Sequence, residues 1–500
     1  MNRALFLLHR WLGLGLGVLV VLWFASAFVL RYVGFPQLTA AERAAGLRPL
    51  PLGGGPIAPA TAFAALGTNA AAVRVRLGEF LGQAVYRVQP APDEPWRLLR
   101  AADAQPVPAV TSADALLVAR AFAGGTHEVS HDGETDLDQW TVSSGLAPFR
   151  PLHRVAVADA VGTRLYVSAR TGEVVRDTRR AERLLNYVGA VTHWIYPVWL
   201  RRHNLVWRIT LRLLSGLALL LPVTGLILGW RRWATARRSL RGARRWHVLL
   251  GLTFGLFALT WLFSGFLSLR LVGVFDDGEP TRAQRDALAG GQLNLAAFVR
   301  SPADAFANLP PGEAREAELV QFAAQPYYLV SGNGASRRLI PANSTASAAG
   351  PIPPERLREQ ARNLMPAHRL TAFEELRTYD AHYYSGAAGA EPRPLPVWRA
   401  RFDDPANTWF HLDPQSGQIT ERLTKGSRAY RWLFNGLHNF DWPWLARRPL
   451  VRDVLALTAL TGGLATSLLG LRLGWLRLRP MVPGPGNPGS TVPLTPHQHA

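Results

Sequence analysis

The chain has 500 residues, no cysteine, and a formal net charge of +20 from 55 basic and 35 acidic side chains. Without cysteine it forms no disulfide, no iron–sulfur cluster and no thiolate-ligated haem. Its mean hydropathy of +0.04 fits neither an ordinary soluble protein nor a chain that lies wholly in a membrane.

Four uncharged apolar stretches divide the chain, at 11–30, 213–230, 248–269 and 454–471. Each is long enough, or nearly so, to cross a bilayer core of roughly 30 Å. We therefore predict four membrane-spanning helices. Ala25-Ser26-Ala27 resembles a cleavage site and would make the first stretch a signal peptide, but the apolar run is long for one.

The distribution of charge predicts the orientation of these spans. The linker 231–245 carries seven arginines and no acidic residue, whereas every acidic residue except Asp441 and Asp453 lies within 31–185 or 270–430. A basic patch between two spans follows the positive-inside rule, so we do not expect a nucleic-acid partner. Both termini and the linker are then cytoplasmic, and both long polar regions lie outside the cytoplasm.

The chain also repeats itself. Matched pairs are His9 and His247, Gly13 and Gly251, Gly17 and Gly255, Ser26 and Ser264, Gly172 and Gly417, His193 and His438, and Gly225 and Gly470. Both halves begin in the cytoplasm, so they are parallel repeats, which are typically related by a pseudo-two-fold axis along the membrane normal. Equivalent residues are then expected to lie at one depth and to face each other.

This pattern predicts an integral membrane bundle of four helices in two parallel repeats, with two outer α+β domains. The expected order is helix 1 (1–30), outer domain 1 (31–185), interfacial segment and helix 2 (186–230), cytoplasmic loop (231–246), helix 3 (247–270), outer domain 2 (271–430), interfacial segment and helix 4 (431–478), and a disordered cytoplasmic tail (479–500).

Several elements of the outer domains follow from periodicity and turn residues. Residues 114–125 have the spacing of an amphipathic helix that ends in glycines. Residues 162–177 and 407–423 each read as two strands around a glycine turn. Residues 137–142 also have the composition of a strand.

Four histidines occupy symmetric positions at the ends of the spans. His9 and His247 lie at the cytoplasmic ends of spans one and three, and His193 and His438 lie on the outer side of spans two and four. Two imidazoles that approach from opposite sides at one depth are what a bis-histidine b-type haem needs. We therefore expect two haems, with the four histidines as axial ligands of the iron.

Three other interpretations compete at this stage. The histidines would be interfacial residues bonded to backbone or lipid, or they would hold copper, zinc or iron without a porphyrin. His127-Glu128-Val129-Ser130-His131 spells the zinc-protease motif H-E-x-x-H, whose chemistry requires a helix. The glycines before it and the "DGETD" after it disfavour a helix there.

Arginines flank the outer histidines, at Arg201, Arg202, Arg447 and Arg448. Arginines on the outer side of the membrane are not expected from the positive-inside rule, so their presence there needs another explanation. Haem propionates or an anionic ligand at the outer face would supply one, and binding of membrane lipid phosphate is the alternative.

The segments "HRWLG", "RRWH", "TGEV" and "SGQI", with "THWIYPVW" and "LHNFDWPW" after them, resemble the PepSY-associated transmembrane family over nearly the whole chain up to about residue 478. The resemblance implies periplasmic PepSY-like domains on an inner-membrane protein, similar to bacterial ferric-siderophore reductases that carry b-type haem. It also implies His9, His193, His247 and His438 as the haem ligands.

The favoured function is an oxidoreductase that carries electrons across the membrane and reduces a ferric siderophore or other ferric chelate in the periplasm. No nucleotide-binding fingerprint is present, so the electron donor is expected to be a cytoplasmic reductase or a quinol. Two alternatives remain at this stage: a membrane-anchored PepSY protein that binds peptide or a protease, and a small transporter.

Overall fold

The computed structural model describes residues 3–65, 74–92, 94–269, 275, 278–332, 337–345, 350–384 and 392–478. The tail from Pro480, expected to be disordered, lies outside this range. The chain divides into two compact units. One comprises Met1–Phe24, Leu217–Leu259 and Ala459–Ala500, and the other comprises Ala25–Gly216 and Thr260–Thr458.

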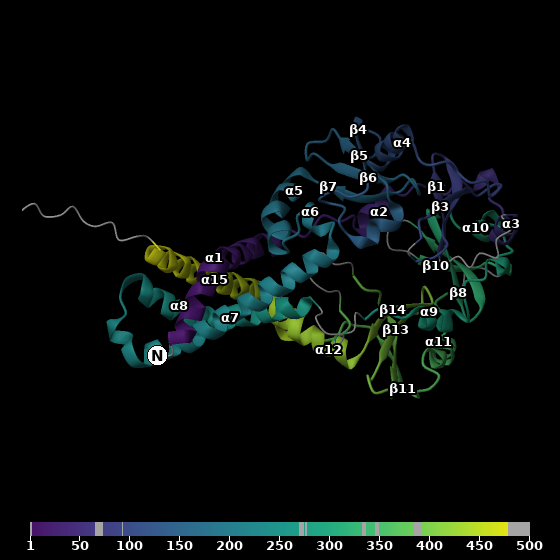
Figure 1. Cartoon of the computed structure of the whole chain (residues 1–500). Coiled ribbons are helices and arrows are strands. Elements are labelled where there is room, and N and C mark those ends of the chain that lie inside the picture. The colour runs from purple at the N-terminus through teal and green to yellow at the C-terminus, as the bar shows by residue number, and fades with distance from the viewer. Residues whose placement is uncertain are drawn as a thin grey trace, which may run out of the picture. The chain divides into compact units, whose positions relative to one another are not determined.

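Four long apolar helices confirm the expectation of four spans. They are α1 (Arg3–Leu30), α7 (Asn204–Ala236), α8 (Gly242–Ser268) and α15 (Pro449–Leu478). Each exceeds the roughly 20 residues that an α-helix needs to cross a bilayer core, and each carries a strongly apolar window. Figure 1 shows the segments of these helices that belong to the first unit gathered into one bundle. The chain is therefore a helical membrane protein, and α7 continues unbroken through Pro222.

Small residues let these helices approach closely within the first unit. A Cβ added at Gly462 of α15 would lie 2.3 Å from the Phe254 ring of α8, and one at Gly463 would lie 2.4 Å from the Phe24 ring of α1. Because lipid tails are as apolar as the side chains, close packing of this kind is a main source of helix association in a membrane.

The second unit contains three antiparallel sheets. One has the order β10-β9-β8-β1-β2-β3, another β4-β5-β6-β7, and the third β11-β12-β13-β14. The strands are β1 (Arg74–Phe80), β2 (Gln83–Gln89), β3 (Arg97–Arg100), β4 (Val129–Thr135), β5 (Leu152–Val157), β6 (Arg164–Ser168), β7 (Val174–Thr178), β8 (Glu316–Phe322), β9 (Gln325–Ser331), β10 (Arg337–Pro341), β11 (Leu370–Leu376), β12 (Val397–Phe402), β13 (Trp409–Asp413) and β14 (Gln418–Leu423).

Shorter helices connect and cover these sheets. They are α2 (Ala40–Gly46), α3 (Pro59–Ala65), α4 (Ser112–Phe122), α5 (Arg180–Asn186), α6 (Val198–Arg201), α9 (Arg282–Ala289), α10 (Pro302–Phe306), α11 (Pro354–Ala361), α12 (Lys425–Tyr430), α13 (Leu437–Asn439) and α14 (Pro443–Ala446). Both outer segments therefore combine helices with sheets (Figure 1).

The six-stranded sheet joins the two halves of the chain, which the sequence did not reveal. Strand β1 of the first half pairs antiparallel with β8 of the second, with Arg76 opposite Glu318 and Leu77 opposite Ala317. Tyr86 and Tyr328 are fully buried in one apolar cluster beneath this sheet. The two outer segments thus share a core, although the sequence boundaries 31–185 and 271–430 treat them as separate domains.

Most of the local expectations hold. The helix expected at 114–125 is α4, and the strand pairs expected at 162–177 and 407–423 are β6–β7 and β13–β14. The strand expected at 137–142 is wrong. There the Asp138 carboxylate accepts hydrogen bonds from the backbone N–H groups of Trp140 and Thr141 and fixes a turn. An aspartate that bonds to backbone two or three residues ahead stabilises a turn rather than a strand.

Candidate functional site

The structure brings His9 of α1 and His247 of α8 together within the first unit. The centres of their rings lie 6.4 Å apart, and the ring planes are inclined at 47°. The two residues occupy equivalent places in the two halves of the sequence. The close approach therefore has the arrangement that a pseudo-two-fold axis between parallel repeats would produce.

Hydrogen bonds from α7 and α15 orient these two rings. His9 Nδ1 lies 2.9 Å from Thr224 Oγ1, and the Thr224 hydroxyl donates its own hydrogen to the Leu220 carbonyl, at 2.6 Å. His247 Nδ1 lies 3.0 Å from the Thr466 carbonyl oxygen. Because the Thr224 hydroxyl oxygen and the Thr466 carbonyl oxygen both accept these hydrogen bonds, each histidine carries its proton at Nδ1. Each therefore presents an unprotonated Nε2, the nitrogen that a metal ion would take.

Two glycines fit against the same rings. A Cβ at Gly225 would lie 3.1 Å from His9 Cε1, and a Cβ at Gly470 would lie 2.8 Å from His247 Cε1. These glycines are equivalent in the repeat. By contrast, Gly17 and Gly255, another matched pair of the repeat, pack against the aliphatic side chains of Leu471 and Leu226.

His193 and His438 form a second pair, which lies in the second unit. Their ring centres are again 6.4 Å apart, with an interplanar angle of 74°. A π-helical turn precedes each histidine, at Tyr187–Val191 and at Arg431–Gly436. These wide turns are rare and occur often at functional sites, and here they recur at equivalent places in both halves.

Serines from α1 and α8 support the outer pair symmetrically. His193 Nδ1 lies 3.0 Å from Ser26 Oγ, and His438 Nδ1 lies 3.0 Å from Ser264 Oγ. Both serines are almost fully buried, at 1% and 0% exposure. Ser264 Oγ also lies 3.1 Å from the Trp261 carbonyl, to which it donates, so the His438 Nδ1–H is the donor between the two side chains. Ser26, in the suspected cleavage site, is thus part of a continuous helix that supports His193.

Burial keeps the His438 ring neutral. Loss of hydration lowers the pKa of His438 to about 4, although a backbone hydrogen bond involving Trp261 raises it in part. The Phe434 ring stacks on His438 with ring centres 5.1 Å apart, and Trp261 Nε1 donates to the His438 carbonyl at 2.9 Å. A neutral imidazole is the form that binds a metal.

The geometry of both pairs fits a six-coordinate iron held between two imidazoles. A metal–imidazole bond is about 2.0 Å and the ring centre lies about 1 Å behind the nitrogen, so two rings on opposite sides of one ion have centres about 6 Å apart. The rings here are 6.4 Å apart in both pairs. A porphyrin supplies four further ligands itself, so two histidines complete the coordination.

A metal site built from protein ligands alone fits less well. Zinc sites typically use three or four protein ligands, and no group of three or more histidine, cysteine or carboxylate side chains converges within the part of the chain that the structure describes. The H-E-x-x-H motif lies at the start of β4 and not on a helix. There His131 bonds to His153, with His131 Nε2 and His153 Nδ1 3.2 Å apart.

The four outer arginines are not found against either histidine pair. Arg201 lies over the Tyr196 and Trp207 rings, with its guanidinium carbon 5.3 and 4.7 Å from their centres. Arg202, Arg447 and Arg448 are exposed. A role for these arginines in haem binding therefore stays a prediction, and their exposure suits lipid phosphate equally well.

The supporting residues Thr224, Thr466, Ser26 and Ser264 were missed as functional residues. The repeat contained a signal for two of them, because Ser26 and Ser264 occupy matched positions on apolar helices. No such signal exists for Thr466, which uses its backbone carbonyl. Searches against models of known protein families and against curated proteins find no match to this chain.

Proposed function

We propose that the protein is a membrane electron carrier that holds two b-type haems, one between His9 and His247 and the other between His193 and His438. The observation that carries this proposal is the recurrence of one ring separation, 6.4 Å, in two pairs that are far apart in sequence and related by the repeat. Chance interfacial histidines have no reason to reproduce that distance.

The protein's own contribution is to place and tune the ligands. Bound haem iron supplies one-electron chemistry, because it alternates between the ferric and ferrous states. Hydrogen bonds at Nδ1 fix the ring orientation of each histidine. For His9, His247 and His438 they also fix the tautomer. Such bonds also make the ligating nitrogen more basic. Burial lowers the pKa of His438 and keeps that imidazole neutral.

The direction of electron flow follows from the proposed topology. The arginine-rich linker 231–245 favours a cytoplasmic location for the end of the bundle that bears His9 and His247. Electrons would enter there from a reductase or a quinol and leave at the outer pair. We place the protein in a bacterial inner membrane, with both termini cytoplasmic and the sheet domains in the periplasm.

The proposed electron acceptor is a ferric siderophore or another ferric chelate, and it rests on the resemblance to PepSY-associated membrane reductases. Reduction of Fe(III) to Fe(II) weakens its hold on hard oxygen ligands and so releases the iron. His193 and His438 would hold the haem that supplies this single electron, and His9 and His247 would hold the haem that replenishes it. No proton or bond change is required of the protein.

Single alanine variants test this arrangement by haem counting. We expect two haems per chain in the purified wild type and one in His438→Ala or His193→Ala, because each change removes one axial ligand of the outer site only. His9→Ala and His247→Ala are likewise expected to lose the inner haem. His203→Ala, an exposed histidine near the outer site in sequence, is the matched control and is expected to retain both.

The same measurement separates the competing functions. A membrane-anchored binding protein or a small transporter would purify without haem, and its histidine variants would change neither spectrum nor composition. Loss of both haems, or of neither, from a single His438→Ala substitution would show that the proposed pairing is wrong.

A further inference from the structure

A cavity of about 490 Å³ lies in the second unit, at the corner where α2, α4, the β1–β2 turn and the β6–β7 turn meet. Its volume is within the range of small-molecule sites, which are roughly 300–1,000 Å³ and mostly apolar with a few polar groups. The cavity residues include five arginines but only two acidic residues, Glu79 and Glu173. The lining is therefore basic.

Buried charge beside the cavity is unbalanced. Arg76 bonds to Glu173 at 2.8 Å and to Glu316 at 3.1 Å, and Arg43 bonds to the same two carboxylates at 3.0 and 2.7 Å. Arg87 adds a third guanidinium, 3.5 Å from Glu173. Three cations thus share two anions, and one of these cations, Arg43, is 31% exposed whereas the other four side chains are at most 10% exposed. The cluster carries a net positive charge beside the cavity, which favours an anion there.

Arg87 is the cation with the weakest pairing. Its guanidinium donates to the backbone carbonyls of Thr171 and Glu79, each at 2.9 Å, and its side chain is only 5% exposed. Burial lowers the pKa of Arg87, Glu173 opposes that shift, and Arg76 adds to it. Arg43 and Arg87 both line the cavity, so an anion bound there would lie near the unbalanced charge.

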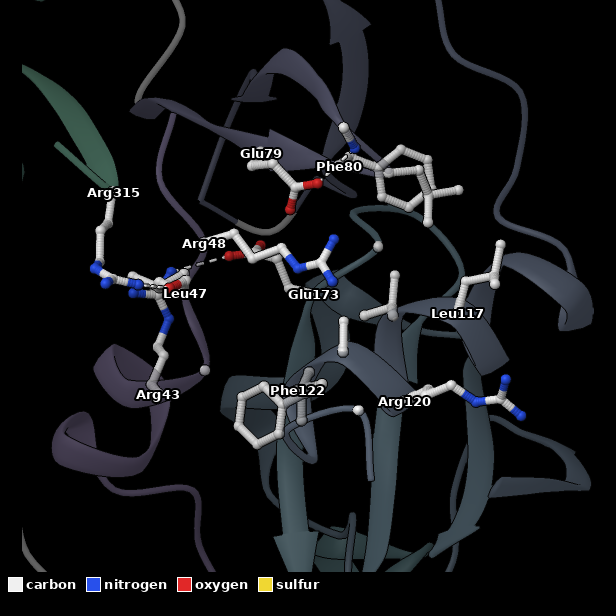
Figure 2. Close-up of a pocket in the computed structure, with 18 of the residues that line it drawn as sticks. Arg43, Leu47, Arg48, Glu79, Phe80, Leu117, Arg120, Phe122, Glu173 and Arg315 are labelled. Carbon is white, nitrogen blue, oxygen red and sulfur yellow. Dashed lines mark hydrogen bonds and ion pairs between the residues drawn. The ribbon is translucent and has the colours of Figure 1, made fainter. Parts of the chain in front are cut away.

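Two further arginines at the cavity are exposed. Arg48 follows α2, and Arg120 lies in the last turn of α4. Neither forms an ion pair with any residue in the described ranges. Figure 2 shows the Arg48 guanidinium extending into the space between the Phe80 and Phe122 rings. The Arg120 guanidinium extends away from Arg48 in the same view, so this exposed side chain would change rotamer to reach a ligand that Arg48 contacts.

The walls of the cavity are apolar. Phe80, Leu117 and Phe122 line it, and glycines set the positions of both rings. A Cβ at Gly172 would lie 2.3 Å from the Phe80 ring, and one at Gly46 would lie 2.1 Å from the Phe122 ring. A ligand with an apolar body and one anionic group would match both the walls and the charge.

In the second half, apolar side chains occupy the place that corresponds to this cavity. Hairpin β8–β9 repeats β1–β2, since Phe322 pairs with Gln325 as Phe80 pairs with Gln83. In this register Leu329 replaces Arg87. Leu329 and Phe322 belong to a continuous apolar cluster with Ile352 and Leu357. The basic cavity is therefore a specific feature of the first half and not a by-product of the fold.

We propose that this cavity binds a small organic carboxylate that carries an apolar group, with Arg48 and Arg120 contacting the carboxylate and Phe80 and Phe122 contacting the apolar body. The proposal goes beyond electron transfer and does not depend on haem. None of its residues contributes to a histidine pair, so substitution at the cavity leaves the haem content as a separate readout.

The test is a titration of the purified full-length protein with 4-phenylbutyrate, followed by isothermal titration calorimetry. We expect saturable binding, and at least about tenfold weaker binding of 4-phenylbutanol, because the alcohol lacks the charge-assisted hydrogen bonds. Inorganic phosphate is expected to bind more weakly than 4-phenylbutyrate, since it cannot use the apolar walls.

The double variant Arg48→Ala/Arg120→Ala is expected to weaken 4-phenylbutyrate binding about tenfold or more while retaining the wild-type haem content. Both arginines are exposed, so the fold is expected to survive. Arg358→Ala is the matched control, because Arg358 is also exposed and lies in the last turn of α11. Its affinity is expected to equal that of the wild type.

Three results would overturn the proposal: equal binding of the acid and the alcohol, unchanged affinity in the double variant, or phosphate binding as tight as that of the acid. The last would indicate a site for a bare anion. Each outcome is independent of whether the histidine pairs hold haem.

Discussion

The two outer hairpins have the same backbone and different chemistry. In β1–β2 the fully buried Tyr86 lies next to Arg87, and in β8–β9 the fully buried Tyr328 lies next to Leu329. Near the first hairpin, Glu173 ion-pairs with Arg43 and Arg76 of the same half. At the matching position of the second half stands Gln418, which is exposed. The two hairpins therefore kept the same architecture, whereas charge diverged at these two positions.

We expect the largest difference between the two hairpin regions when Glu173 is removed. Glu173→Ala leaves Arg43, Arg76 and Arg87 with Glu316 as the remaining partner of the cluster, and we expect it to reduce the free energy of unfolding by about 3–5 kcal/mol. Gln418→Ala, the equivalent change in the second half, is expected to change it by no more than about 0.5 kcal/mol. Thermal melting of the purified variants measures both, and equal effects would mean that the ion cluster is not what stabilises this corner.

Substitutions at glycines next to histidines test the parts that remained symmetric. Gly470→Ala places a Cβ 2.8 Å from His247 Cε1, so the ring must move, and we expect reduced occupancy or a shifted spectrum of the inner haem. Gly265→Ala places a Cβ 3.7 Å from His438 Cε1. That is an ordinary contact, and the outer haem is expected to be unchanged. If both variants bound haem as the wild type does, close packing of Gly470 against the His247 ring would not be what positions that ring.

The smallest expected effect concerns Asp177, whose counterpart in the second half is Arg422. Burial, with repulsion from Glu42 and Glu182, raises the pKa of Asp177 to about 6. A carboxyl with a raised pKa contributes stability below its unfolded pKa and loses it as the pH rises through about 6. Asp177→Asn is therefore expected to raise the melting temperature by about 1 °C at pH 8 and to have little effect at pH 4. A larger gain at pH 4 than at pH 8 would contradict this assignment.

The sequence predicted the structure correctly where the length of an apolar stretch or the internal repeat determined it. Four spans followed from hydropathy, and helix α4 and the strand pairs β6–β7 and β13–β14 followed from periodicity and glycine turns. The close approach of His9 to His247 and of His193 to His438 was expected from the repeat. Whether those pairs hold haem, and whether the chain is a ferric-chelate reductase, remain proposals.

What the sequence could not reveal depends on contacts between distant segments. The pairing of β1 with β8 joins residues about 240 positions apart, and no local pattern specifies which edge strands meet. The turn at Asp138 was missed because a side-chain hydrogen bond overrode the apolar character of its neighbours. The cavity was missed because its arginines come from α2, β2, α4 and two connecting segments.

The most direct test of the central claim is an optical spectrum of the wild-type protein, purified after expression with adequate haem supply and recorded oxidised and then reduced with dithionite. Two symmetric histidine pairs predict a b-type spectrum and two haems per chain. A featureless spectrum under these conditions would contradict the electron-carrier proposal and leave a membrane-anchored protein whose paired histidines serve only its structure.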